Sequence, residues 1–168
     1  MTEEVDWVDA SDQVVGRVAR ADVHRLRAGF RVVHVFLFDR EGRLLIHQLS
    51  PRKRLAGHWG SSVAGGVKAG EAPEEAARRE IREEMGIRPP PLRWLGKVRL
   101  EDQGATKFLY LYAGVVDAPE RVQPNPEEVA AVEFVRVDAL RDIVRRRERS
   151  FTPTFLTAFA LFERGAVA

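Results

Sequence analysis

Residues 65–87 read GGVKAGEAPEEAARREIREEMGI, a glycine-rich start followed by alanines and charged residues. Pro73 suits the first turn of a helix, where an N–H would have no intrahelical partner. The residues from Ala76 to Met85 have high helix propensity, and Gly86 suits a C-terminal cap. The stretch therefore predicts a loop, then a helix from about Pro73 to Met85, then a second loop.

Three glutamates of this helix share one face. With Glu80 at 0°, a rotation of about 100° per residue places Glu83 at about 300° and Glu84 at about 40°. An apolar face adjoins them and consists of Ala77, Ile81 and Met85. Like charges this close repel one another, and hard divalent cations such as Mg²⁺ favour carboxylate oxygens. The helix pattern alone allows a metal site at the edge of a cleft, or a surface helix whose glutamates pair with its own arginines.

The flanking residues favour the first interpretation. The stretch fits Gly-x5-Glu-x7-Arg-Glu-(apolar)-x-Glu-Glu-x-Gly-(apolar) at every fixed position. These positions are Gly65, Glu71, Arg79, Glu80, Ile81, Glu83, Glu84, Gly86 and Ile87. With average residue frequencies of a few per cent each, a chance match at a given start is on the order of one in 10^10. The stretch resembles the Nudix box, and the chain resembles the Nudix hydrolase superfamily.

The resemblance implies the α/β class, as an α/β/α sandwich with a mixed sheet in which the box forms a loop–helix–loop. It implies that Glu80, Glu83 and Glu84 are catalytic and hold one or more Mg²⁺ ions, for which Mn²⁺ can substitute. The implied reaction is hydrolysis of a diphosphate linked to another group. A bound divalent ion stabilises charge on phosphoryl oxygens and lowers the pKa of a bound water.

Other residues receive roles from the same resemblance. Arg79 orients the carboxylates and also binds the substrate, and Gly65 and Gly66 let the backbone approach the substrate. Glu71 ties the loop together.

The general base stays open among a box glutamate and the two glutamates of PNPEEVAAVEF, Glu127 and Glu128. We favour Glu128, because relatives carry a glutamate in a similar loop that reaches the metal. The alternative for Glu128 is a solvated loop carboxylate.

Residues 5–90 also resemble the isopentenyl-diphosphate-isomerase-like branch of the superfamily. They share its opening, VDWVDASDQVVGRVAR, a histidine in the connector, and the stretch LFD-x-x-G-x-LL. True isomerases need a cysteine and a metal-binding histidine in a Ser-Val-Cys-Gly-His stretch, where this chain has Ala64 and Gly66. His24 matches a second metal histidine, but the next one falls at Phe30. A methyl group cannot move a proton, so we expect a member of this branch that is not an isomerase.

Outside the box, a basic loop and several ring side chains are candidates for substrate contacts. Arg52 and Lys53, in the loop Pro51–Arg54, are expected to bind the diphosphate, with a solvated loop as the alternative.

We expect the strand histidines His34 and His47 in the core or at a strand edge. His58 lies in a loop near the box. Four aromatic residues can fill the core or stack on a base, and we expect at least half in the core: Trp59, Phe108, Tyr110 and Tyr112.

The rest of the chain predicts one domain over residues 1–168. A hairpin and connector at 5–28 precede a Nudix domain at 29–165. Strands are expected at 31–39, 43–50, about 92–100, 107–116 and 130–137, and helices at 138–149 and from Thr152-Pro153 to about Phe162. Strands and helices do not alternate strictly, which favours a mixed sheet between helices.

Composition limits the partners. The 27 basic and 25 acidic residues give a net charge of +2, too balanced to favour nucleic acid. No apolar run approaches about 18 residues, so we expect no membrane span. The start of the sequence lacks a secretory pattern, and cysteine is absent, so we expect a cytoplasmic protein, monomeric or homodimeric.

We expect a Mg²⁺-dependent pyrophosphohydrolase acting on a small phosphoanhydride, a nucleoside di- or triphosphate. Alternatives in the same class of reaction are nucleotide sugars, dinucleoside polyphosphates and isoprenoid diphosphates. A different class is a non-catalytic Nudix domain that senses a nucleotide or binds a partner, which the intact glutamates disfavour.

Overall fold

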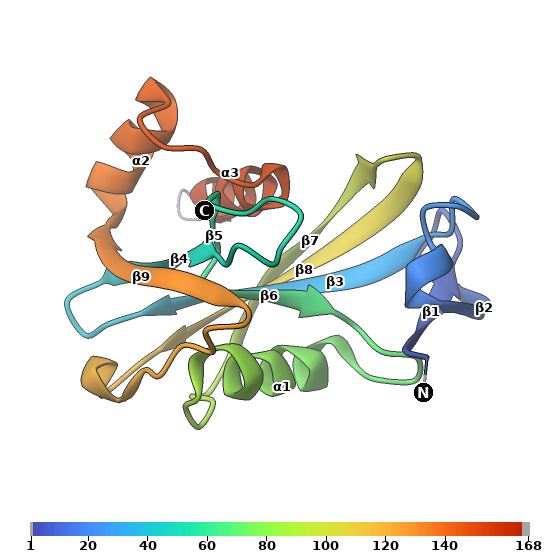
Figure 1. Cartoon of the computed structure of the whole chain (residues 1–168), viewed down its shortest axis with the longest axis horizontal. Helices are drawn as coiled ribbons and strands as arrows, with labels where there is room; N and C mark the ends of the chain where they lie inside the picture. The colour runs from blue at the N-terminus through green and yellow to red at the C-terminus, as the bar shows by residue number, and fades with distance from the viewer. Residues whose placement is uncertain (1, 166–168) are drawn as a thin grey trace.

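The computed structural model describes residues 2–165 (Figure 1). In chain order the elements are β1 (Glu4–Val8), β2 (Val14–Ala19), a 3-10 turn (Arg20–Asp22), β3 (Phe30–Phe38), β4 (Arg43–Leu49), β5 (Trp59–Gly60), β6 (Val63–Gly66), α1 (Pro73–Met85), β7 (Arg93–Asp102), β8 (Ala105–Val115), a second 3-10 turn (Pro119–Arg121), β9 (Val129–Arg136), α2 (Val137–Arg146) and α3 (Pro153–Gly165).

Seven strands form the main sheet, which is mixed as predicted. Five of them follow the order β5-β4-β3-β8-β7, while β6 also pairs with β3 and β9 with β4. Strands β3 and β8 run parallel from Phe30 opposite Lys107 to Phe38 opposite Val115, and the other pairings are antiparallel. Strand β3, FRVVHVFLF, is almost entirely buried, which suits its apolar, β-branched composition.

Helices cover both faces of this sheet, so the α/β/α sandwich is confirmed. Alternate residues of a strand face opposite sides. Val33 and Val35 of β3 accordingly join a core with Ile81 of α1. Phe36 joins the opposite core with Phe155 of α3. Figure 1 shows α1 on one side of the sheet, with α2 and α3 on the other.

Helix α1 has the predicted boundaries. Pro73 occupies its first turn, and Gly86 ends it in the left-handed conformation, at φ 64°, with its N–H donating to Arg82 O at 3.1 Å. The helix buries its apolar face against the sheet, together with one acidic side chain: Ala76, Ala77, Ile81, Glu84 and Met85. The glutamate face therefore lies at the edge of the sheet, next to β6.

The N-terminal hairpin forms as predicted and is anchored on the main sheet. Arg31 Nε donates to Asp12 Oδ1 at 2.7 Å, Lys97 Nζ donates to Asp12 Oδ2 at 3.0 Å, and the Tyr110 hydroxyl also donates to Asp12. Burial opposes ionisation of Asp12, but these bonds outweigh it and lower its pKa. The hairpin also reaches the loop before α1, because Ala69 N donates to Glu4 O at 2.9 Å.

Two local details differ from the sequence prediction. The predicted loop over residues 51–60 ends in the short strand β5, which pairs with β4 through Trp59 opposite Gln48. Helix α3 continues to Gly165 rather than ending near Phe162. Its predicted cap is confirmed, because Phe155 N donates to Thr152 Oγ1 at 3.1 Å. Within residues 2–165, no helix combines the length and apolar character needed to cross a membrane.

Candidate active site

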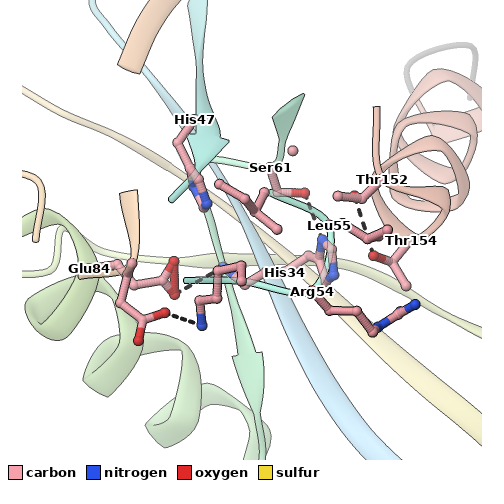
Figure 2. Close-up of a pocket in the computed structure, with 13 residues that line it drawn as sticks. His34, His47, Arg54, Leu55, Ser61, Glu84, Thr152 and Thr154 are labelled. Carbon is pink, nitrogen blue, oxygen red and sulfur yellow. Dashed lines mark hydrogen bonds and ion pairs between the residues drawn. The ribbon is translucent and has the colours of Figure 1, made fainter. Parts of the chain in front are cut away.

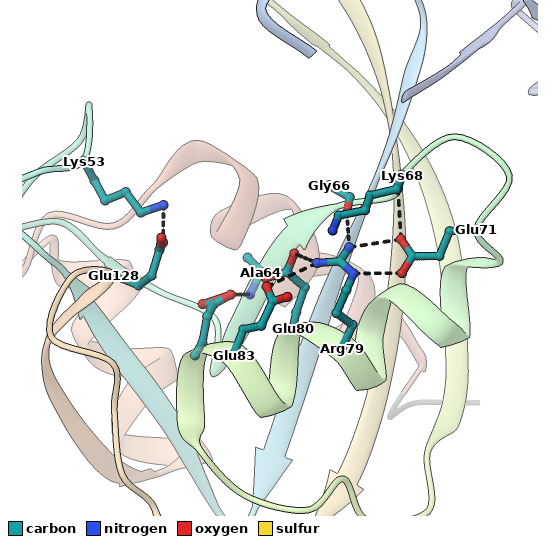
Figure 3. A network of polar contacts seen from close by, with 10 residues as sticks. Lys53, Ala64, Gly66, Lys68, Glu71, Arg79, Glu80, Glu83 and Glu128 are labelled. Carbon is teal, nitrogen blue, oxygen red and sulfur yellow. Dashed lines mark hydrogen bonds and ion pairs between the residues drawn. The ribbon is translucent and has the colours of Figure 1, made fainter. Parts of the chain in front are cut away.

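A cavity of about 550 Å³ opens beside β6 and the glutamate face of α1. We call it the acidic basin, because five carboxylates line it: Glu3 near the start of the chain, and Glu80, Glu83, Glu84 and Glu128. Glu80, Glu83 and Glu84 come from α1, Glu128 comes from the loop before β9 (Figure 3), and Glu3 precedes β1. The structure thus brings together every residue predicted from sequence to hold the metal and the residue favoured as general base.

Arg79 organises the basin from one side (Figure 3). Its Nε and Nη2 donate to the two carboxyl oxygens of Glu71 at 2.8 and 3.0 Å. Its Nη1 donates to Glu80 at 2.6 Å and to Glu83 at 3.3 Å, and its Nη2 donates to Gly66 O at 2.9 Å. These bonds to Glu71 and Glu80 raise the pKa of Arg79 further.

The five bonds employ all five guanidinium N–H groups. The geometry therefore suits the orienting role predicted for Arg79, and it leaves no N–H for the substrate contact that was also predicted.

Glu71 closes the loop that leads into α1. Its Oε2 accepts a bond from Lys68 N at 2.9 Å in addition to the Arg79 pair. Burial opposes ionisation of Glu71, but the bond from Arg79 outweighs it and lowers its pKa. Glu71 thus holds the loop to Arg79 of α1, in agreement with the role predicted from the sequence.

The Glu80 side chain occupies the space beside Gly65 that a larger residue would need. A Cβ built on Gly65 would lie 2.7 Å from Glu80 Cγ, and closer still to its carboxyl atoms. At Gly66, by contrast, the nearest atom to such a Cβ is Arg20 Nε at 3.8 Å. The backbone of β6 therefore packs directly on a glutamate at Gly65 and faces the basin at Gly66.

Glu84 is the most buried of the carboxylates that line the basin, with 4% of its surface exposed. Its Oε2 accepts a long bond of 3.4 Å from Ala64 N. Burial, followed by the charge of Glu80, raises the pKa of Glu84 well above its usual range. Burial likewise raises the pKa of Glu80. The two carboxylates share a poorly hydrated corner that favours a neutralising charge.

The donor set fits a hard divalent cation. Such ions take carboxylate, carbonyl and water oxygens, and the basin is lined by five carboxylates and by Asn125. Within residues 2–165, no three acidic or histidine side chains converge closely enough, as they stand, to surround an ion. Arg79 Nη1 donates to both Glu80 and Glu83 and so occupies these two carboxylates.

Cationic side chains also line the basin. Lys53 forms an ion pair with Glu128 there. Arg52, the other residue predicted to grip the diphosphate, is 73% exposed, pairs with Glu127 at 3.3 Å, and does not line the basin.

Two further cations line the basin and were not found from the sequence: Arg20 and Lys68. Among the described residues, neither forms an ion pair with a carboxylate. Arg20 lies at the end of the hairpin, with its guanidinium 4.9 Å from the centre of the Phe30 ring. No local motif marks it, because only the docking of the hairpin brings it to the basin.

A second cavity, of about 240 Å³, adjoins the basin and shares Lys53, Ala64, Glu84 and Glu128 with it. We call it the side cavity (Figure 2). His34 and His47 are buried, as expected for core histidines, and they also line this cavity. His24 lies elsewhere and pairs with Asp102 at 3.3 Å.

The four aromatic candidates lie outside both cavities. Phe108 and Tyr112 are buried, Tyr112 in the core that contains Ile81, and the Tyr110 hydroxyl donates to Asp12. Trp59 packs under the guanidinium of Arg149, 4.9 Å from the ring centre. The expectation that at least half fill the core is confirmed.

Comparison with known proteins identifies the family. A family model described as NUDIX domain matches residues 29–155. An uncharacterized Nudix hydrolase from Pseudomonas aeruginosa is 30% identical over 161 residues, covering 95% of this chain and 93% of that protein. The isopentenyl-diphosphate Delta-isomerase of Serratia proteamaculans is 31% identical, covering 94% and 89%.

Among solved structures, the crystal structure of a Deinococcus radiodurans protein superposes with a TM-score of 0.78 at 29% identity, covering 96% of this chain and 98% of that one. The fold, the sequence motif at residues 65–87 and the relatives all indicate the same family. The chain belongs to the Nudix hydrolase family, whose members act on phosphorus anhydrides.

Proposed function

We propose that this protein is a divalent-cation-dependent pyrophosphohydrolase that cleaves the diphosphate of a nucleoside di- or triphosphate, with Mg²⁺ as its ion and Mn²⁺ as a substitute. The observation that carries the proposal is the acidic basin. Five carboxylates and the cationic side chains of Arg20, Lys53 and Lys68 line it together. An ion on the carboxylates and a polyphosphate on the cations would satisfy both sets of charges.

Each group has a distinct part in this proposal. Glu80, Glu83 and Glu84 would hold the ion, which when bound supplies charge stabilisation and a more acidic water. Arg79 keeps Glu80 in place through its bonds to Glu71 and Gly66. Arg20 and Lys68 would orient the phosphates. Gly66 would present backbone to the substrate.

Glu128 is our choice for general base. It lines the basin together with the box glutamates, Lys53 holds it there in an ion pair, and a carboxylate can accept a proton from an attacking water. A box glutamate and Glu127 are the alternatives, although Glu127 is exposed and pairs with Arg52 outside the basin.

Isomerase activity is the second candidate, because relatives carry that name. The structure argues against it at one position. Ala64, where the isomerases need a cysteine, lies between the basin and the side cavity and offers only a methyl group and a backbone N–H. No group there can transfer a proton to carbon.

The proposal is tested by phosphate and pyrophosphate release from a panel of nucleoside di- and triphosphates, nucleotide sugars and isopentenyl diphosphate, with Mg²⁺ or Mn²⁺. We expect turnover of nucleotides and no isomerisation. Binding of a nucleotide without turnover of any compound would instead favour the sensing function, and release from isoprenoid diphosphates alone would move the substrate to that class.

A further inference from the structure

The N-terminal hairpin, formed by β1 and β2, lies outside residues 29–155, the part of the chain that matches the family model. It is a two-stranded sheet of its own, separate from the main sheet. Figure 1 shows it at the end of the main sheet where β3 begins, near the loop that leads into α1. The proposed hydrolysis uses the box and the cations of the basin, but it leaves the hairpin as a whole without a role.

The hairpin carries one of the cations that line the basin. Arg20 directly follows β2, and its backbone N–H donates to Glu3 O at 2.8 Å, just before β1. Its guanidinium lies 4.9 Å from the centre of the Phe30 ring, and its Nε would lie 3.8 Å from a Cβ built on Gly66. The position of the Arg20 charge in the basin therefore depends on how the hairpin docks.

The hairpin also holds the segment that carries a second cation, Lys68. Ala69 N donates to Glu4 O at 2.9 Å, and Gly70 N donates to the carboxylate of Asp6 at 3.2 Å. Both donors follow Lys68 within two residues, and both acceptors belong to β1. A shift of the hairpin would therefore move the backbone beside Lys68 as well as Arg20.

A buried carboxylate in the turn of the hairpin fixes its docking. Asp12 is 4% exposed and accepts bonds from Arg31, Lys97 and Tyr110. These three donors belong to three different strands of the main sheet, β3, β7 and β8. Hydrogen bonds between ionised partners are about twice as strong as neutral ones, so Asp12 is the strongest polar anchor of the hairpin.

Apolar contacts alone would not set the orientation of the hairpin. Val5 of β1 and Val18 of β2 are buried in the core that also contains Phe155. Hydrophobic burial is non-directional, so it holds the hairpin on the sheet without fixing its angle. Asp12 in the turn and Asp6 in β1 supply two polar contacts at separate points, and two fixed points define a direction.

We propose that the N-terminal hairpin is a phosphate clamp, in which Asp12 and Asp6 are positioning residues that hold Arg20 and Lys68 at the phosphates of the substrate. Neither aspartate lines the basin, so both act through the two cations. The inference rests on the proposed hydrolase function and adds to it an element that lies outside the family match. Because the clamp binds phosphates without touching the carboxylates of α1, its loss should raise KM and spare kcat.

Asp12→Asn tests the clamp with the smallest change. Asparagine has nearly the same shape and tolerates the left-handed backbone of this position, at φ 62°, but it lacks the charge that attracts Arg31 and Lys97. We expect KM for the best nucleotide to rise by about 3- to 10-fold with kcat within about twofold. Asp6→Ala should act in the same direction. An unchanged KM in both variants, or a fall in kcat without a rise in KM, overturns the inference.

Asp39→Asn is the matched control. Asp39 is also 4% exposed and accepts a bond from Arg43 Nε at 2.6 Å, so the variant loses a comparable buried ion pair. It lies just after β3, at the opposite end of that strand from the hairpin (Figure 1), and lines neither cavity. We expect its KM to stay within about twofold of wild type. An equal rise in Asp39→Asn and Asp12→Asn would show general loosening of the fold and overturn the inference.

A second background separates positioning from a general loss of structure. In Arg20→Ala/Lys68→Ala the clamp has no cation left to position, so adding Asp12→Asn should change KM by less than about twofold. A rise as large as in the wild-type background would show that Asp12 acts by another route. If Asp12→Asn does not fold, Tyr110→Phe takes its place, because it removes a single bond to Asp12 and keeps the ring; we then expect a rise of about 2- to 3-fold.

Failure of the proposed function would be visible separately. If no nucleotide is hydrolysed, calorimetry with Mg²⁺ and imidodiphosphate, a diphosphate that resists hydrolysis, still decides the inference. Binding to Asp12→Asn that is at least about threefold weaker than to wild type, with Asp39→Asn unchanged, supports the clamp. Equal affinities of wild type and Asp12→Asn, or no binding by wild type, overturn it.

Discussion

Replacing Gly65 with alanine would place a methyl group where the Glu80 side chain now lies. The added Cβ would be 2.7 Å from Glu80 Cγ, whereas ordinary contacts begin at 3.4 Å. The carboxyl atoms lie closer still, so the carboxylate must retreat by about 1 Å. That retreat stretches the 2.6 Å bond between Arg79 Nη1 and Glu80, which holds the ligand in position.

A displacement of about 1 Å in a catalytic constellation can cost on the order of 100-fold in rate. We therefore expect Gly65→Ala to lower kcat/KM for the best nucleotide by about 100-fold and to weaken Mn²⁺ binding. The melting temperature should change little, because the atoms that move belong to the flexible end of one side chain.

Steady-state kinetics and Mn²⁺ titration followed by electron paramagnetic resonance measure the two effects. Gly16→Ala is the matched control, since it makes the same change within a strand where a Cβ would meet no atom within 4 Å. Gly66→Ala does not displace Glu80, so this variant should bind Mn²⁺ as tightly as wild type even if its KM for the nucleotide rises. A Gly65→Ala enzyme within threefold of wild type in kcat/KM and in Mn²⁺ affinity would refute the reasoning.

Three further changes test other parts of the account. Glu84→Gln should lower kcat about 100-fold or more with an unchanged circular dichroism spectrum, as expected when a metal-activated water is lost; a loss below about threefold would argue against a ligand role. Arg20→Ala should raise KM about tenfold with kcat within threefold, because a phosphate-orienting cation contributes mainly uniform binding; an unchanged KM would remove Arg20 from the substrate site. Burial lowers the pKa of His34 to about 3, against an ordinary value of 6.5, so the unfolded chain binds the extra proton and stability falls as pH drops from about 6.5 toward 3. In urea unfolding between pH 6.5 and 5, the free energy of unfolding should depend more steeply on pH in wild type than in His34→Gln, by a slope that approaches about 1.4 kcal/mol per pH unit. Parallel curves for the two proteins would show that His34 titrates normally.

Local patterns in the sequence were sufficient to predict the box. The helix from Pro73 to Met85, its Gly86 cap and its glutamate face all follow from rules that act within one or two turns. The mixed sheet was also predictable, because strands with β-branched residues and irregular alternation with helices have few packing solutions. The same rules could not supply contacts between segments far apart in the chain.

Those distant contacts account for what the sequence missed. Arg20 reaches the basin only because Asp12 anchors the hairpin on Arg31 and Lys97. Arg52 and Lys53 are adjacent and both basic, yet the turn that Lys53 N closes onto Ser50 O points one outward and the other into the basin. The reason for Gly65 was likewise hidden, since its neighbour Glu80 lies on another element.

The central claim is that Glu80, Glu83 and Glu84 hold a divalent ion beside the substrate phosphates. A crystal grown with Mn²⁺ and α,β-methylene UDP, and measured at the manganese absorption edge, tests it most directly. The account predicts an anomalous peak within coordination distance of at least two of the three carboxylates, with Glu83 released from Arg79. No peak in the basin, with Arg79 still bound to both Glu80 and Glu83, would contradict it.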